Sequence, residues 1–117
     1  MKGIRIISSV ALLGTVMCSN VIADDISSAY LKTVCASYVE KPANASDGMC
    51  IGYVVGVISV MQYINALCLP VTSTHSQMTL VVKKYLSDHP EKLHLNAEVL
   101  VIDALQEAFP CIDTHFE

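Results

Sequence analysis

Four cysteines constrain the fold of this chain more than any other feature. Cys35, Cys50, Cys68 and Cys111 all follow an N-terminal segment that has the pattern of an export signal. An even number of cysteines in a small exported domain is typical of a disulfide framework. Their spacings of 15, 18 and 43 residues include no Cys-x-x-Cys pair, which argues against a zinc ribbon. We therefore expect two disulfides, for which four cysteines allow three pairings.

The first 23 residues of the 117-residue chain are typical of a secretory signal peptide. Lys2 and Arg5 precede an uncharged apolar run over 6–18, and small residues stand at the positions that a signal peptidase recognises before Ala23. The run is too short to span a bilayer comfortably, which argues against a membrane anchor. We expect cleavage after Ala23 and a mature domain over 24–117.

Composition and charge exclude several classes of protein. Hydrophobic residues make up 53% of the chain and charged residues 15%, so the chain is not intrinsically disordered. Removal of the first 23 residues, with their two basic side chains, takes the net charge from −4 to −6. Without a basic cluster, neither nucleic acid nor an anionic lipid surface is an expected partner.

Hydrophobic periodicity predicts four helices and no strands in the mature domain. The expected helices cover residues 26–39, 49–67, 75–87 and 96–109. Suitable N-caps precede them, namely Asp25 or Ser27, Asp47, Thr74 with Gln77 as a capping box, and Asn96. A proline follows the end of each, at positions 42, 70, 90 and 110.

The 49–67 helix is apolar on almost every side, so it lies either inside a bundle or between two subunits. A transmembrane span is the competing interpretation, but polar residues such as Ser59 interrupt the helix and the bundle needs it as its core. Gly52, Gly56 and Ser59 form a stripe of small residues at helical spacing. Such a stripe permits close approach of another backbone, either within one subunit or across a homodimer.

Short connections favour an up-down-up-down arrangement of the four helices. The first helix then ends where the second begins, which places Cys35 near Cys50. The second and fourth helices end together at the other side, which places Cys68 near Cys111. The sequence thus predicts an all-α, disulfide-bonded four-helix domain with the pairs Cys35–Cys50 and Cys68–Cys111, and we expect it to be a homodimer.

The sequence shows no catalytic or phosphate-binding pattern. Its serines and threonines lack a nucleophile-elbow motif, and no glycine-rich loop is present. The four histidines, His75, His89, His94 and His115, stand at helix ends, in a loop and in the tail. A zinc site from His89 and His94 would need two further ligands. We expect neither an enzyme nor a bound cofactor or metal.

Four short motifs carry a resemblance to a known family. They are CIGYVVG at 50–56, CLP at 68–70, YL at 85–86 with HPE at 89–91, and AFPC at 108–111. In this order and spacing they resemble the Rap/Tai family, which contains immunity proteins of type VI secretion amidase effectors. The resemblance implies a small all-helical homodimer in the periplasm. It also implies a partner, a cysteine peptidase-like peptidoglycan amidase, whose active-site cleft the immunity protein occludes.

In that family a helix of one subunit and a protruding loop of the other make the block, which points here to the 75–87 helix and the turn at 87–94. This turn is polar, is stiffened by Pro90, and can offer His89 or Glu91 to a cleft that holds a catalytic cysteine and histidine. Alternatively, this segment only ends the 75–87 helix and has no role in binding. The candidate effector-binding residues are Lys83, Lys84, Asp88, His89, Pro90, Glu91 and His94.

A second class of function is a small periplasmic chaperone-like protein that protects clients in acid. Size, export and an acidic surface favour it. Such chaperones loosen at low pH, whereas two disulfides and an unbroken apolar helix favour a rigid domain. The immunity protein is therefore the leading hypothesis.

Overall fold

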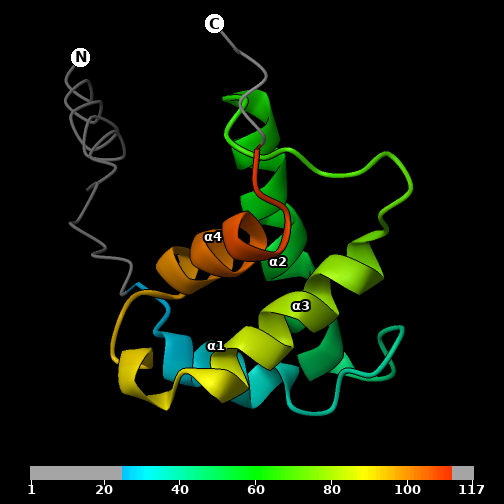
Figure 1. The fold of residues 1–117 in the computed structure, drawn as a ribbon. Helices are drawn as coiled ribbons and strands as arrows, with labels where there is room; N and C mark the ends of the chain where they lie inside the picture. The colour runs from blue at the N-terminus through cyan, green and yellow to red at the C-terminus, as the bar shows by residue number, and fades with distance from the viewer. Residues whose placement is uncertain (1–24, 112–117) are drawn as a thin grey trace, which may run out of the picture.

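The computed structural model describes residues 25–111 and is all-α, as predicted (Figure 1). Its elements are α1 (Ser28–Cys35), α2 (Ala45–Tyr63), α3 (His75–Asp88), the short 3-10 helix η2 (Pro90–Lys92) and α4 (Ala97–Ala108). Within these residues, extended backbone is paired only in an isolated bridge between Ser27 and Asn96. The predicted signal peptide over 1–23 lies outside the described residues.

Helix α2 crosses the other three helices instead of running antiparallel to its neighbours. In Figure 1 it rises through the view, whereas α1, α3 and α4 lie across it. One side of α2 packs against all three of these helices. The 11-residue connection over 64–74 is long enough to carry the chain from the end of α2 to a differently oriented α3. The expectation of an up-down-up-down bundle is therefore wrong for α2, because it assumed short connections throughout.

Each helix contributes one buried stripe to a common core. The buried apolar residues are Leu31, Val34, Cys35 and Tyr38; Cys50, Val54, Ile58 and Met61; Met78, Val82, Tyr85 and Leu86; and Ala97, Leu100, Val101, Ala104 and Leu105. These stripes follow the helical spacing of the sequence. Two apolar residues of these helices lie outside the core, since Tyr30 is 48% exposed and Ala108 is exposed.

The predicted disulfide pairing is the one that the structure has. Cys35 is bonded to Cys50 with their Cα atoms 4.9 Å apart, and Cys68 to Cys111 with their Cα atoms 5.0 Å apart. The first bond joins the end of α1 to the second turn of α2. The second joins the connection after α2 to the chain segment that follows α4. Both ends of α2 are thus linked to a sequence-distant segment.

Helix α2 begins four residues earlier than predicted, because Asn44 and not Asp47 is its N-cap. The Asn44 side chain accepts a hydrogen bond of 2.8 Å from the Asp47 amide. The buried Asp47 carboxylate accepts hydrogen bonds from the Ser37 hydroxyl and, at 3.0 Å, from the Ala43 amide. These bonds fasten the connection over 36–44 to the first turn of α2.

Helix α2 also ends earlier than predicted, at Tyr63 and not near Pro70. Asn65 adopts a left-handed backbone conformation with φ of 58°, which asparagine tolerates better than most residues. The Ala66 amide then donates to the Met61 carbonyl at 2.8 Å, and the Asn65 amide to the Gln62 carbonyl at 3.0 Å. This is a Schellman motif, which satisfies the last carbonyl groups of the helix.

Helix α1 is shorter than the predicted 26–39, because the chain turns after Cys35. Tyr38 is completely buried, and its hydroxyl lies 3.1 Å from both the Glu40 carbonyl and the Ser76 hydroxyl. Lys83 of α3 donates to the Tyr38 carbonyl at 2.8 Å. The connection between α1 and α2 is therefore also fastened to α3.

By length and composition, α2 could cross a membrane. Its buried residues, however, belong to the same core as those of α1, α3 and α4. The core accounts for the apolar residues on the inward side of α2, whereas apolar residues such as Met49 and Val60 on its other sides are exposed.

We expect Asp47→Asn to lower the melting temperature and to flatten its dependence on pH in the acid range. Hydrogen bonds from Ser37 and from the Ala43 amide hold the pKa of Asp47 below its ordinary 3.8 against the opposing effect of burial, and Lys83 acts in the same direction. The stabilisation is therefore complete above pH 3.8 and is lost as the pH falls through the lower folded-state pKa.

Thermal unfolding followed by circular dichroism between about pH 2 and pH 6 measures this effect. Glu40→Gln, which alters an exposed acid in the same connection, is the matched control. A pH profile of Asp47→Asn that matches the wild-type profile would contradict the assignment.

Candidate functional site

The candidate site is the turn that follows α3, which we call the 88–94 turn. Helix α3 ends at Asp88, and His89 leaves helical geometry with φ of −126° and ψ of 61°. Pro90 then opens η2, in which the Lys92 amide donates to the His89 carbonyl at 3.0 Å. Proline fixes its own φ, and the hydrogen bond closes the turn, so the backbone here has little freedom.

The far end of the turn is attached to the beginning of the domain. The Ala29 amide donates to the Leu93 carbonyl at 3.0 Å, and the Ser28 amide to the Leu95 carbonyl at 2.9 Å. The buried Ser28 hydroxyl donates to the Asn96 carbonyl at 3.2 Å. Leu93 and Leu95 themselves pack against the core. The turn is thus held at both ends, by α3 and by the first turn of α1.

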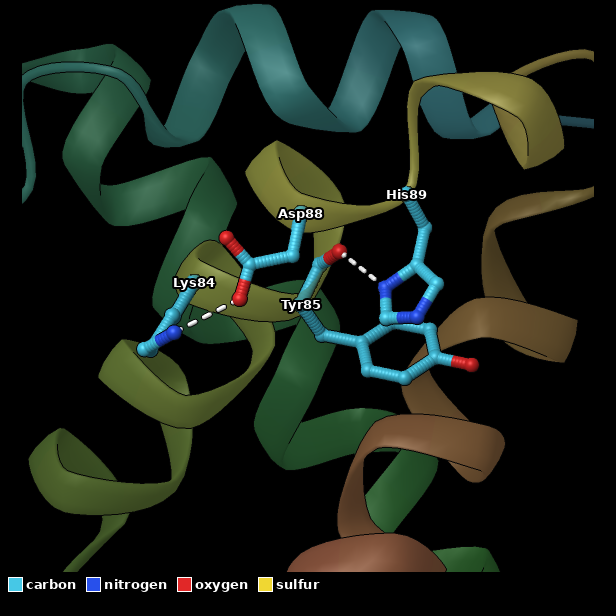
Figure 2. A network of polar contacts seen from close by, with 4 residues as sticks. All are labelled: Lys84, Tyr85, Asp88 and His89. Carbon is cyan, nitrogen blue, oxygen red and sulfur yellow. Dashed lines mark hydrogen bonds and ion pairs between the residues drawn. The ribbon is translucent and has the colours of Figure 1, made fainter.

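Side chains at the end of α3 form a polar network of two adjacent groups, Lys84 with Asp88 and Tyr85 with His89 (Figure 2). The His89 ring stacks on Tyr85 with 3.9 Å between ring centroids, and its Nδ1 lies 2.9 Å from the Tyr85 carbonyl oxygen. Because a carbonyl oxygen only accepts, Nδ1 carries the hydrogen, and a neutral His89 keeps Nε2 as an acceptor. The Lys84 ammonium lies 2.6 Å from the Asp88 carboxylate, and Lys92 donates to the Tyr85 hydroxyl at 3.1 Å.

These contacts stabilise the charged forms of three side chains. The hydrogen bond between Lys84 and Asp88 raises the pKa of the lysine and lowers the pKa of the carboxyl group. The hydrogen bond to Tyr85 raises the pKa of Lys92. At neutral pH the network therefore keeps fixed charges in a fixed arrangement, which a binding partner can match.

A groove of about 290 Å³ lies between the ends of α3 and α4, beside this network. Its lining residues are Val81, Lys84, Tyr85, Asp88, His89, Ala104, Glu107 and Ala108. Tyr85 and Glu107 of this groove are not among the residues that the sequence predicts for effector binding. The four-residue spacing of Lys84 with Asp88 and of Tyr85 with His89 is the signal that could have identified the network.

The structure brings together only part of the predicted set of residues. Lys84, Asp88 and His89 are neighbours in the network, and Pro90, Glu91 and His94 are exposed on the same turn. Lys83 is not part of this group. It is half-buried, and its ammonium group is bonded to the Tyr38 carbonyl, so it supports the fold.

A second surface of different character lies on the outer side of α2. Gly52, Gly56 and Ser59 are all exposed there, and a Cβ atom added at either glycine would meet nothing within 4 Å. Among the residues that the structure describes, the glycines of the small-residue stripe therefore make no tight contact. A groove of about 540 Å³, which we call the α2 groove, is lined by Gly52, Tyr53, Gly56, Val57, Val60, Met61, Glu98 and Ile102.

The α2 groove holds one polar pair in an otherwise apolar lining. The Tyr53 hydroxyl donates to the Glu98 carboxylate at 3.1 Å, and burial together with this contact raises the pKa of Tyr53 to about 12. A smaller groove of about 240 Å³ continues the apolar surface toward α1 and shares Gly52 and Tyr53 with the first. The exposed side chains of Tyr30 and Met49 belong to this continuation.

Within residues 25–111, no three His, Cys, Asp or Glu side chains are placed to hold a metal ion. What the two surfaces can do chemically is bind another molecule: one through oriented polar groups on a rigid turn, the other through apolar contact.

Comparison with known proteins identifies the family. A family model described as Rap1a immunity proteins matches residues 27–111. The chain belongs to the Rap1a immunity protein family. The match includes all four α-helices of the structure. It therefore includes α1, which precedes the motifs at 50–111 that carried the resemblance. No curated protein and no solved structure matches the chain.

As a Rap1a family member, the protein is expected to bind a secreted effector. Its two disulfides agree with a secreted or periplasmic location. The 88–94 turn and the α2 groove both lie within the residues that the Rap1a model matches.

We expect the double variant His89→Ala/Glu91→Ala to melt within about 3 °C of the wild type, because neither side chain belongs to the core. Ser28→Ala is the contrasting variant. It removes a buried hydroxyl from the Asn96 carbonyl, should cost about 1 kcal/mol, and should lower the melting temperature by about 4–8 °C. Circular dichroism melts of the three proteins measure both effects. A larger loss in the double variant than in Ser28→Ala would assign the turn side chains to the fold.

Proposed function

We propose that this protein is a periplasmic immunity protein of a type VI secretion system. Its partner is a secreted peptidoglycan amidase of the cysteine peptidase-like class, whose active-site cleft it occludes. The observation that carries the proposal is the match of residues 27–111 to the Rap1a immunity family. The protein acts as an inhibitor by binding and not as an enzyme.

The 88–94 turn is the element that we assign to the cleft. It is held at both ends by hydrogen bonds and is stiffened by Pro90, so it loses little conformational entropy when it binds. Its exposed Glu91 carboxylate and the free Nε2 acceptor of His89 suit a cleft whose catalytic cysteine and histidine can donate hydrogen bonds. The groove beside the turn gives the rim of such a cleft a place to pack.

Charge favours an effector with a basic surface. The mature domain carries a net charge of −6, and its basic side chains near the turn, Lys84 and Lys92, are engaged with Asp88 and Tyr85. Complementary charge raises the rate of association and makes that rate fall as salt increases.

We also propose that a second copy of the chain covers the α2 groove in a homodimer. The lining of the groove includes one carboxylate, Glu98, which is bonded to Tyr53. Two acidic subunits can therefore meet at this face with little like-charge repulsion, and the open positions at Gly52 and Gly56 allow close approach. A two-fold symmetric pair is the expected form. The lining residues of this groove and of the groove beside the turn do not overlap, so the dimer leaves the turn accessible.

We expect His89→Ala/Glu91→Ala to weaken inhibition of a cognate amidase by about 30-fold or more, because a few interface residues usually carry most of the binding energy. Inhibition constants from a peptidoglycan cleavage assay measure this. The control is Glu40→Ala/Lys41→Ala, which removes two exposed charges outside the turn and should inhibit like the wild type. Equal inhibition by the turn variant would move the contact away from the turn. Failure of the wild type to inhibit any amidase would reject the proposed target.

For the dimer, we expect the wild type to show twice the mass of one chain by light scattering at about 10 μM, and Gly56→Glu to be monomeric with unchanged helicity. Space is open at Gly56, so the substitution fits the monomer but places a charge in the proposed interface. Val71→Glu, which alters a fully exposed apolar residue of the 64–74 connection, is the control and should remain dimeric. A monomeric wild type would reject the dimer.

A further inference from the structure

The two disulfides of this protein differ sharply in accessibility. Cys35 and Cys50 are both 0% exposed and lie in the core. Cys68 and Cys111 are both exposed. Thiol–disulfide exchange requires a thiolate to reach a sulfur atom, so its rate depends on access. In the folded protein, only the second bond offers that access.

The backbone around the exposed bond is also open. Cys35 and Cys50 belong to α1 and α2, whose amide and carbonyl groups are engaged in helical hydrogen bonds. Cys68 lies in the stretch over 66–70, which follows the Schellman motif and has neither helix nor strand. Next to it, the Gln106 side chain donates to the Ala66 carbonyl at 3.4 Å. A second polypeptide can therefore lie along this stretch without first breaking helical structure.

We propose that the Cys68–Cys111 bond is a site of thiol–disulfide exchange with a dithiol reductant, and that Cys35–Cys50 is not. A thiolate of the reductant attacks one of the two exposed sulfurs and forms a mixed disulfide, while the other cysteine leaves as a thiolate and takes up a proton. The second thiol of the reductant, once deprotonated, then attacks the mixed disulfide. The reductant leaves as its own disulfide, and two electrons and two protons have passed to Cys68 and Cys111.

Reduction of this bond acts on one end of the molecule. The bond spans 43 residues, which include α3, the 88–94 turn and α4. Leu67, Leu69 and Phe109 pack on the core near it and lose their tether when it opens. The 88–94 turn leads into the N-terminus of the 12-residue helix α4, which is about 18 Å long, whereas Cys111 follows its C-terminus. The groove beside the turn lies nearer to the bond, because Glu107 and Ala108 line it. The anchors of the turn are the backbone bonds to Ser28 and Ala29, which do not involve either disulfide.

The exchange site therefore controls stability and not the shape of the turn. Loss of a cross-link over so long a loop destabilises a small domain considerably in the chain-entropy model. The buried Cys35–Cys50 bond persists and keeps α1 joined to α2. The reduced protein is accordingly a folded but less stable form with an intact 88–94 turn.

The test uses the mature protein with both bonds formed. Dithiothreitol is the reductant, samples are alkylated at intervals, and peptide mass mapping locates the labelled cysteines. We expect Cys68 and Cys111 to be labelled about 10-fold faster or more than Cys35 and Cys50, because a buried bond is reached only after the structure opens. Equal rates, or earlier labelling of Cys35 and Cys50, would overturn the proposal. No effector enters the measurement, so its failure is distinct from failure of the proposed function.

A second measurement uses the selectively reduced and alkylated wild type. We expect it to keep its helical circular dichroism at 25 °C and to melt about 10 °C or more below the oxidised form. Hydrogen exchange at the amides of Lys92, Leu93 and Leu95 should be as slow as in the oxidised protein, because their hydrogen bonds are retained. The variant Cys68→Ser/Cys111→Ser should behave in the same way. Fast exchange at these amides in either form would show that the Cys68–Cys111 bond does determine the structure of the turn, and would overturn this part of the proposal.

Discussion

Helix α2 has apolar residues on all of its sides, but α1, α3 and α4 cover only one side of it. Cys50, Val54 and Ile58 are buried in the common core, where each large apolar side chain contributes about 1.5–3 kcal/mol. On the opposite side, Val60 is 61% exposed and Gly56 faces open space. The inward side of α2 organises the fold, because α1, α3 and α4 all pack against it. The outward side remains available for another molecule.

The position of the candidate site depends on that core through a chain of specific contacts. The Cys35–Cys50 bond and the Asp47 carboxylate fasten the end of α1 to α2, and Lys83 fastens the same connection to α3. Once α1 is placed, the backbone at Ser28 and Ala29 determines where the far end of the 88–94 turn lies. A turn exposed to solvent is thereby held by groups that are buried or paired, which is a common way to preorganise a binding loop.

Local sequence patterns were sufficient for much of the fold. The four helices and the capping box of Thr74 with Gln77 could be predicted, because each depends on spacing or on a short-range hydrogen bond. Both disulfide pairs were also predicted correctly, although the up-down-up-down layout from which they were derived is wrong for α2. The first and last residues of α2 could not be predicted. Asn44 and not Asp47 caps the helix, and the left-handed backbone of Asn65 ends it before Pro70; only the backbone geometry makes either choice visible. The crossing of α2 over its neighbours depends on how four stripes pack together, which no single stripe determines.

The candidate site was predictable to a similar degree. The polar turn with Pro90 stands out in the sequence, and the structure places His89 and Glu91 on it. The placement of Lys83 could not be predicted, because a lysine on a helix can turn either to solvent or to a carbonyl group contributed by another segment. Glu107 was missed because it joins the turn only through the packing of α4 on α3. Contacts between sequence-distant elements, and not local propensity, decide both cases.

The central claim is that the 88–94 turn enters the active-site cleft of an amidase. Photo-cross-linking of the complex tests it most directly, with a benzophenone side chain at position 91 and, as a reference, at position 71. Both positions are exposed, so either can react with a bound partner. We expect position 91 to cross-link to the amidase peptide that contains the catalytic cysteine, and position 71 not to do so. Cross-linking of that peptide from position 71 alone would contradict it.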